Sequence, residues 1–355
     1  MERNRPRPRP RVSGALRLLW SHSKGGARLT RSSPAVEALL SSHRLRAYEA
    51  LPWLAAVAAF VFFPEYHALG AQILTAILFA LSLDLILGYA GIVTLGHAAF
   101  FGVGAYTAGL LAAHGWGEPI SGLVIAGIVA GLAGILSGAI VLHTKGLTLL
   151  MLTLMIAAML QEAANKAGAI TGGADGLQNM RVAPVLGLYR FDMLGNTAYI
   201  YCLAVLFVGW LVTRRIVNSA FGRALTGIRE NELRMQAIGS PVFRRRLTAY
   251  AVAAALAGVA GGLMAQTTQF VALDSLSFER SGAVLIMLIL GGVGRLYGAF
   301  IGAPLYMIAQ DRFAQQDPVY WYFWIGLLLV LVVKFARGGA LAVLERVTRR
   351  YRVRP

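Results

Sequence analysis

Long apolar runs separated by short polar loops constrain this chain more than any other feature. A helix that crosses a bilayer needs about 20 apolar residues, because each residue adds about 1.5 Å. Ten such runs lie near 48–66, 69–88, 92–113, 120–142, 147–168, 196–214, 247–269, 281–293, 297–313 and 319–336. Since 57% of the residues are hydrophobic, most of the chain must face lipid or other helices. We therefore predict an all-α polytopic membrane protein of about ten transmembrane helices, with eight or nine also compatible because the run at 281–293 is short.

The distribution of basic residues predicts how the chain is oriented. Cytoplasmic loops are enriched in Lys and Arg, and an inner N-terminus places 28 of the 33 basic residues inside and five outside. Both termini are then cytoplasmic, with a basic tail at 1–46, a transmembrane domain at 47–337 and a second basic tail at 338–355. This topology accounts for the net charge of +17 without a nucleic-acid partner.

The first 46 residues begin "MERNRPRPRPRV" and hold no apolar run long enough to cross a bilayer. Alternating Arg and Pro is typical of an extended, solvated chain, and a secretory signal would need an apolar core soon after its basic start. We expect a disordered tail close to anionic lipid rather than a specific binding arm.

Several signatures of enzymes are missing from the sequence. The single cysteine, Cys202, cannot form an intrachain disulfide, and no Cys/His cluster has metal-ligand spacing. No Gly-Lys pair exists to build a phosphate-binding P-loop, and neither HExxH nor GxSxG occurs. We expect no metal site, no cofactor in this chain and no catalysis by the chain alone.

The stretch "GYAGIVTLGHAAFFGVGAYTAG", 88–109, places six glycines at the junction of two predicted helices. In lipid, irregular backbone is tolerated only where protein buries it or where it lines a water-filled cavity. One interpretation is a helix broken at a substrate path, and the other is close helix packing, to which Gly102, Gly104 and Gly109 are suited. The candidate path residues are Asp84, Gly88, Tyr89, Gly91, Thr94, Gly96 and His97.

Two ionisable residues of this stretch have structural and functional interpretations. An ionised carboxylate at mid-membrane costs about 2.5–3.5 kcal/mol, so Asp84 needs a partner, a proton or water. We favour structural hydrogen bonding over substrate contact for Asp84. His97 beside the break can present a donor to a ligand, or it can be satisfied by a carbonyl of a neighbouring helix.

A charged island, "FGRALTGIRENELRMQAIG" at 221–239, lies in a predicted cytoplasmic loop at 214–247. We predict two short helices, because Asn231 followed by Glu232 is a good helix start and Gly239 a good helix stop. The island can be a basic loop that only fixes orientation. A loop of more than thirty residues is longer than topology requires, however, and long ordered loops usually bind something.

Two further stretches are rich in glycine. "ITGGADGLQNM", 170–180, in the predicted outer loop at 169–195, is either a set of tight turns or a docking surface, to which Lys166, Arg181 and Arg190 would attract an acidic partner. "GGVGRLYGAFIGAPLY", 291–306, is a second glycine-interrupted junction on the same predicted side as the first. The two junctions are compatible with an internal repeat, as in many transporters.

These four stretches, in their order along the chain and with their separations, resemble the LivM-type permease subunits of branched-chain amino acid ABC importers. The resemblance extends from about Leu51 to Arg337. It implies a bacterial inner-membrane importer with a second, LivH-like permease, two ABC ATPase subunits that hold ATP and Mg, and a periplasmic binding protein. It also implies that the island is a coupling helix that docks on an ATPase subunit and transmits its movement to the bundle.

The resemblance assigns residues to three further sites. The docking loop comprises Thr171, Gly172, Gly173, Asp175 and Gly176. The ATPase-coupling segment comprises Gly222, Arg223, Arg229, Glu230, Asn231, Ala237 and Gly239. The second junction comprises Gly291, Gly292, Gly294, Gly298 and Gly302.

Alternatives remain for the substrate and for the class of protein. Many members of the family have a polar residue where Ile92 stands and an amide where Asp84 stands, and an acidic residue at the latter position is familiar in the related urea permeases. Urea or a short amide is therefore an alternative substrate, and an aromatic acid is another, because permeases of this wider group also serve systems for aromatic acids. A secondary transporter that moves protons through Asp84 and His97 is an alternative class, as is a membrane scaffold whose glycines serve packing alone.

Overall fold

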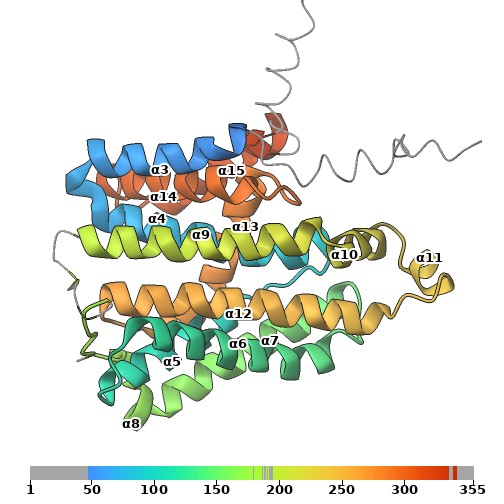
Figure 1. Ribbon diagram of the computed structural model, residues 1–355, viewed down its shortest axis with the longest axis horizontal. Helices are drawn as coiled ribbons and strands as arrows, with labels where there is room; N and C mark the ends of the chain where they lie inside the picture. The colour runs from blue at the N-terminus through green and yellow to red at the C-terminus, as the bar shows by residue number, and fades with distance from the viewer. Residues whose placement is uncertain are drawn as a thin grey trace, which may run out of the picture. The chain divides into compact units, whose positions relative to one another are not determined.

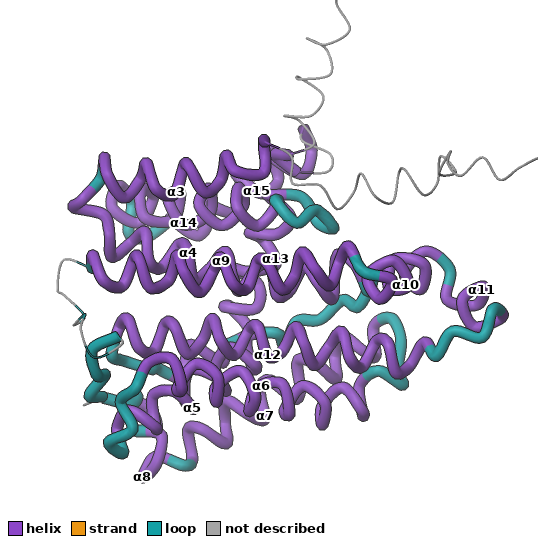
Figure 2. The backbone as a smooth tube through the Cα atoms, in the orientation of Figure 1, coloured by secondary structure: helices purple, strands orange, loops and turns teal. Residues whose placement is uncertain are grey.

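The described chain is built from helices and the loops between them (Figure 2). The computed structural model describes residues 47–335 and 339–341, apart from 179, 186, 188, 190 and 192–194. The helices of four or more residues named here are α3 (Leu51–Phe62), α4 (His67–Asp84), α5 (Ala98–Ala113), α6 (Pro119–Val141), α7 (Leu147–Lys166), α8 (Gly168–Thr171), α9 (Asn196–Asn218), α10 (Ala220–Glu230), α11 (Glu232–Ala237), α12 (Val242–Thr268), α13 (Phe278–Gly291), α14 (Gly298–Gln316) and α15 (Trp321–Phe335). The predicted tail at 1–46, and that at 338–355 except for 339–341, lie outside the described residues, and the division into domains stays a prediction.

Each of the ten apolar runs overlaps one of the long α-helices of the described chain. Within the part of the chain that the structure describes, five helices are long and apolar enough to cross a membrane: the span Pro64–Tyr89 that includes α4, and then α6, α7, α9 and α12. Helices α3 and α5 and most of α15 are apolar but shorter. This is the pattern of a multi-pass helical membrane protein.

Several helix boundaries differ from the expected ones, and three of them concern the first glycine-rich stretch and the charged island. The helix expected from residue 92 begins at Ala98, because the chain from Ala90 to His97 is irregular. The loop expected at 214–247 is shorter than predicted, since α9 continues to Asn218 and α12 begins at Val242. Apolarity marks where a helix is buried in lipid, whereas helical hydrogen bonding continues past that point into the polar region.

Helix α12 lies at the centre of one group of helices and contacts α4, α5 and α6 (Figure 1). Small residues allow this close approach. A Cβ atom on Gly104 would overlap the backbone of Gly258, and one on Gly261 would overlap the carbonyl of Phe101. Glycines 102 and 109 likewise contact neighbouring side chains. Close packing through small residues, typical of helices in lipid, is therefore the role of this part of the first glycine-rich stretch.

We expect Gly104→Val to destabilise the bundle, because the added side chain would collide with the backbone of α12. Overpacking of this kind costs about 1–3 kcal/mol, which thermal unfolding in detergent would detect as a lower Tm. The matched control is Gly326→Val in α15, where an added Cβ meets nothing within 4 Å. Equal Tm values for the two variants would show that the α5–α12 contact is not tight.

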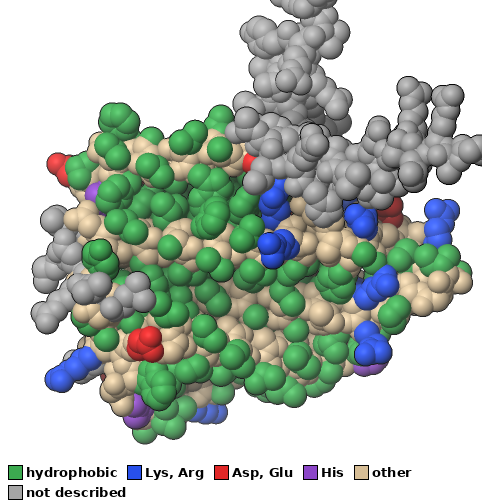
Figure 3. Space-filling view, in the orientation of Figure 1, with side chains coloured by type: hydrophobic (Ala, Val, Ile, Leu, Met, Phe, Trp, Pro, Cys, Tyr) green, Lys and Arg blue, Asp and Glu red, His purple; other side chains and the backbone are tan. Residues whose placement is uncertain are grey.

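Helix α10 lies beyond the end of α9, and α11 projects beyond the ends of both α9 and α12 (Figure 1). Hydrophobic side chains dominate the face formed by the long helices, while most of the Lys and Arg side chains visible there gather toward the end that carries α10 and α11 (Figure 3). The described part of the molecule therefore has an apolar middle and a basic end.

Candidate functional site

The first glycine-rich junction breaks a helix inside the bundle. Helix α4 ends at Asp84 and continues as a π-helix, Leu85–Tyr89, before the irregular segment to His97. Gly91 adopts a left-handed conformation, φ +69°, and the amide of Ile92 donates to the carbonyl of Ile86. Ala90, Ile92 and Thr94 are buried, so protein covers much of the irregular backbone. Single π-turns inside α-helices are frequent at functional sites.

Asp84 joins this break to the second glycine-rich junction. Its Oδ1 atom accepts a hydrogen bond of 2.7 Å from the backbone amide of Gly294, while its Oδ2 atom is buried and has no hydrogen-bond partner among the described residues. A Cβ on Gly88 would overlap both Asp84 Oδ1 and the Gly294 backbone. Gly294 itself has φ +75°. Glycine is therefore needed at both positions, for close approach at one and for a left-handed conformation at the other.

Arg229, near the end of α10, completes the cluster. Its guanidinium donates to the carbonyl of Gly88, and its aliphatic stem lies against Gly91. The same guanidinium lies beside Gly294. Three stretches that are far apart in the sequence thus meet at one point. We call Asp84, Gly88, Gly91, Arg229 and Gly294 the junction cluster.

The remaining path residues lie apart from this cluster. His97 shares a hydrogen bond of 2.8 Å with Ser82 Oγ, and its ring stacks on Phe79 at 5.5 Å between centroids. Because Ser82 Oγ donates its one proton to the carbonyl of Phe79, it accepts from His97 Nε2. A side chain, rather than the expected helix carbonyl, therefore satisfies one nitrogen of His97. The other nitrogen, Nδ1, has no partner among the described residues.

The segment on either side of His97 is held by neighbouring helices. The amide of Gly96 donates to Thr94 Oγ1 at 3.2 Å, and a Cβ on Gly96 would overlap the carbonyl of Thr153 on α7. The amide of Ala98 donates to Ser281 Oγ on α13 at 2.9 Å. Tyr89 is half-buried at the end of the π-helix. These contacts fix where α5 begins and explain why its first residue is Ala98.

Both short helices of the charged island have side-chain caps. Asn231 Oδ1 accepts from the amide of Arg234 and Gly239 has φ +80°, so the expected start and stop of α11 are confirmed. Ser219, which the sequence analysis did not single out, caps α10 by accepting from the amide of Gly222. Helix α10 is amphipathic, with Leu225 and Ile228 buried.

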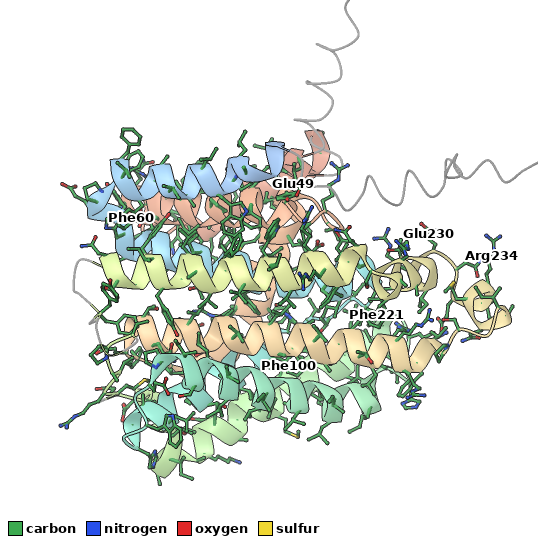
Figure 4. All side chains as sticks on the ribbon, viewed as in Figure 1. Glu49, Phe60, Phe100, Phe221, Glu230 and Arg234 are labelled. Atoms are coloured by element: carbon green, nitrogen blue, oxygen red, sulfur yellow. The ribbon has the colours of Figure 1, made fainter. Side chains whose placement is uncertain are left out.

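Much of the coupling segment is exposed. Glu230 and Arg234 lie on the projecting part of the chain (Figure 4). The exposed members of the predicted segment are Arg223, Arg229, Glu230, Asn231, Ala237 and Gly239, whereas Gly222 is buried against the carbonyls of Ile216 and Val217. Leu233 and Ile238 are 77% and 71% exposed, which leaves two large apolar side chains uncovered on a charged surface. Such a surface suits a protein partner.

Helix α11 is also tied to the bundle by Glu232. This carboxylate pairs with Lys145, in the loop between α6 and α7, at 2.8 Å and with Arg246 of α12 at 3.9 Å. Sequence reasoning counted Lys145 and Arg246 only as inner basic residues. No local pattern links residues 87 positions apart, so the contact was not predictable from the sequence.

The predicted docking loop lies at the opposite end of α12 from α10. Gly172, Gly173 and Gly176 all have positive φ values, and Thr171 Oγ1 accepts from the amide of Gly173. Leu177 pairs with Val271, so this loop is attached to the segment that follows α12. Asp175 is exposed. The loop is an ordered set of tight turns, and it does not contact the junction cluster.

The other glycines of the second junction pack α13 against α14. A Cβ on Gly291 would overlap the carbonyl of Gly298, one on Gly298 that of Gly292, and one on Gly302 that of Met287. Of the five glycines predicted here, only Gly294 reaches the junction cluster.

The chain is a multi-pass membrane protein whose broken helix is contacted by Arg229 of α10; we call α10 and α11 together the α10–α11 hairpin. Residues 67–333 match the family described as "Branched-chain amino acid transport system / permease component", so the chain belongs to this family of transporter subunits. As a permease component it is not itself an enzyme.

Curated relatives carry consistent names. The chain is 29% identical over 287 residues to the high-affinity branched-chain amino acid transport system permease protein LivM of Escherichia coli K12, which covers 75% of this chain and 67% of the relative. The counterpart from Salmonella typhimurium LT2 gives the same figures. A probable LivM permease of Methanocaldococcus jannaschii is 27% identical over 315 residues, covering 73% of this chain and 88% of the relative. No solved structure shows significant similarity.

Proposed function

We propose that this chain is the LivM-type permease subunit of an ABC importer and forms the translocation path for branched-chain or related hydrophobic amino acids. The family and the names of the relatives support this assignment. The observation that carries the mechanism is the junction cluster, because it connects the exposed α10–α11 hairpin to the broken helix. Movement of the hairpin then moves the backbone at the break.

The charge distribution supports an orientation. The end that carries α10 and α11 also carries basic residues of α9 and of α12, among them Arg214, Arg215, Arg244 and Arg245. We place this end in the cytoplasm of a bacterium, together with both termini, and the docking loop on the periplasmic side. About ten helices then cross or enter the inner membrane, and the shorter ones are covered by neighbours or by a partner.

The partners follow from the proposed mechanism. The α10–α11 hairpin docks on one of two ABC ATPase subunits, which bind ATP and Mg, whereas this chain binds neither. A LivH-like second permease completes the path, and the outer loop with Thr171 and Asp175 receives a periplasmic substrate-binding protein. Charged groups around the exposed Leu233 and Ile238 make docking specific.

A pull-down of the tagged chain from native membranes tests this proposal. ATPase activity should co-purify, and a binding protein loaded with leucine should stimulate it. Binding proteins loaded with urea or an aromatic acid are the comparison arms, because these are the alternative substrates. A chain that purifies without any ATPase contradicts the proposal.

A further inference from the structure

A second feature of the bundle lies away from the junction cluster. A cavity of about 380 Å³ opens among α4, α12, α13, α14 and α15. This volume falls in the range of about 300–1,000 Å³ typical of small-molecule sites. Its α4 residues, Gln72, Thr75 and Phe79, precede Asp84 by five to twelve positions, which corresponds to about 8–18 Å along the helix. The cavity is therefore at the docking-loop end of α4.

Charges of both signs are present at this cavity. Arg280 of α13 pairs with Asp274 at 2.6 Å, and Glu279 adds a second carboxylate. The guanidinium of Arg280 also lies over the ring of Phe101, 5.6 Å from its centroid, which holds it in place. The structure records one side-chain hydrogen bond for this guanidinium among the described residues, so donors of its five N–H groups remain for a ligand.

Apolar side chains form part of the remaining cavity wall, alongside the polar side chains of Gln72, Thr75, Thr267, Thr268 and Gln310. Phe79, Phe101, Val284, Met264 and Met287 line it, and all but Met264 are buried. Phe79 also stacks on His97, so the floor of the cavity is in contact with the segment that follows the helix break. Apolar and aromatic side chains combined with a few polar and charged groups are the usual form of a specific small-molecule site.

We propose that this cavity binds the transported amino acid within the permease, with Arg280 receiving the carboxylate, Asp274 and Glu279 receiving the ammonium group, and the apolar floor receiving the side chain. This inference rests on the proposed function and adds the site and its recognition chemistry. Guanidinium–carboxylate pairing is the strong, directional form of charged hydrogen bonding.

The charges discriminate among the possible substrates. An aromatic monocarboxylate has no ammonium group, so Asp274 and Glu279 would repel it. Urea has neither charge and would leave the apolar floor in contact with water. A zwitterion with an apolar side chain pairs with Arg280, pairs with the two carboxylates and contacts the apolar floor. A ligand that lacks one of these groups leaves charged side chains unpaired, so the cavity should strongly prefer the zwitterion.

Protection from thiol labelling tests the site directly. The one native cysteine, Cys202, is fully buried, so Thr268→Cys at the rim of the cavity provides the only accessible thiol among the described residues. In the importer purified in detergent, leucine should slow maleimide labelling of this thiol by about tenfold at ten times its Kd. Leucinamide lacks the carboxylate and 4-methylpentanoate lacks the ammonium group, and neither should protect at the same concentration. Ala113→Cys, an exposed position outside the cavity, is the control thiol and should label at one rate throughout.

Substitutions then test which charged side chains of the cavity bind leucine. Arg280→Gln in the Thr268→Cys background should abolish protection by leucine, and Asp274→Asn should weaken it, whereas Arg312→Gln, on an exposed arginine of α14 outside this cavity, should not. Equal protection by leucine and both analogues, or none by leucine, would overturn the inference. ATP-driven leucine uptake by the unaltered importer is measured in parallel. If uptake is normal while protection is absent, the site is wrong and the proposed function stands; if neither uptake nor an attached ATPase is found, the proposed function fails.

Discussion

Arg229→Glu is expected to reduce ATP-driven uptake by about 10- to 100-fold while leaving the helices assembled. The guanidinium of Arg229 is the contact between α10 and the broken helix, because it donates to the carbonyl of Gly88. A hydrogen bond to a charged group contributes about 1.5–3 kcal/mol, and each 1.4 kcal/mol corresponds to a tenfold change in an equilibrium constant. Glutamate cannot donate this bond and also places a second carboxylate near Asp84. Uptake of radiolabelled leucine into proteoliposomes that hold the complete importer is the measurement.

The matched control for this variant is Arg244→Glu. Arg244 is exposed at the same end of the bundle, in the first turn of α12, and has the same charge to reverse. Its uptake should stay near that of the unaltered importer. Both variants should co-purify with the ATPase subunits, so that loss of uptake by Arg229→Glu alone is a loss of coupling. Full uptake by Arg229→Glu would remove the junction cluster from the mechanism.

The second large effect is expected at Asp84, where two substitutions should have opposite outcomes. Asp84→Asn keeps a side-chain oxygen that can accept from the amide of Gly294, so we expect uptake within about threefold of the unaltered importer. Asp84→Ala leaves that amide without its partner, at a cost of about 1–3 kcal/mol. We therefore expect Asp84→Ala to lose most of its uptake and to lower the Tm of the purified complex.

These variants also separate the importer from a proton-coupled transporter. If Asp84 carried a proton during transport, replacing its carboxyl group with an amide would stop the cycle even though the fold is kept. Loss of uptake by Asp84→Asn equal to that by Asp84→Ala would thus favour proton coupling. Retained uptake by the asparagine variant assigns Asp84 a structural role at the helix break.

The helices were predictable because the bilayer imposes their length and composition. Each of the ten apolar runs overlaps a helix, and α11 of the charged island begins and ends near the residues that capping chemistry indicates, whereas Ser219, the cap of α10, was not foreseen. The start of α5 was not predictable from composition. It depends on the left-handed conformation of Gly91 and on the contact of Gly96 with the carbonyl of Thr153, which only the packed bundle supplies.

The members of the junction cluster were predictable singly but not as a cluster. Asp84 stands out as a carboxylate in an apolar run, Arg229 as part of the charged island and Gly294 as part of a glycine-rich stretch. Their separations of 141 residues between Gly88 and Arg229 and 210 between Asp84 and Gly294 give no local signal of contact. Ser82, which bonds His97, was missed because a lone serine in an apolar helix is most often satisfied by its own backbone.

The cavity at Arg280 was not predicted either. The sequence showed Arg280 only as one of five outer basic residues, and Asp274 and Glu279 have no distinctive pattern around them. These three residues come close to Phe79 and Phe101 only because α13 packs beside α4 and α5. Tertiary packing, rather than any motif, brings charges of both signs to an apolar floor.

We expect this chain to conduct an amino acid inward when partner subunits hydrolyse ATP. Proteoliposomes that contain the complete importer, with ATP inside and a leucine-loaded binding protein outside, test it most directly when a protonophore has collapsed the proton gradient. We predict leucine uptake that persists under these conditions and stops when ATP is replaced by a non-hydrolysable analogue. Uptake that needs the proton gradient and continues without ATP hydrolysis would contradict the account.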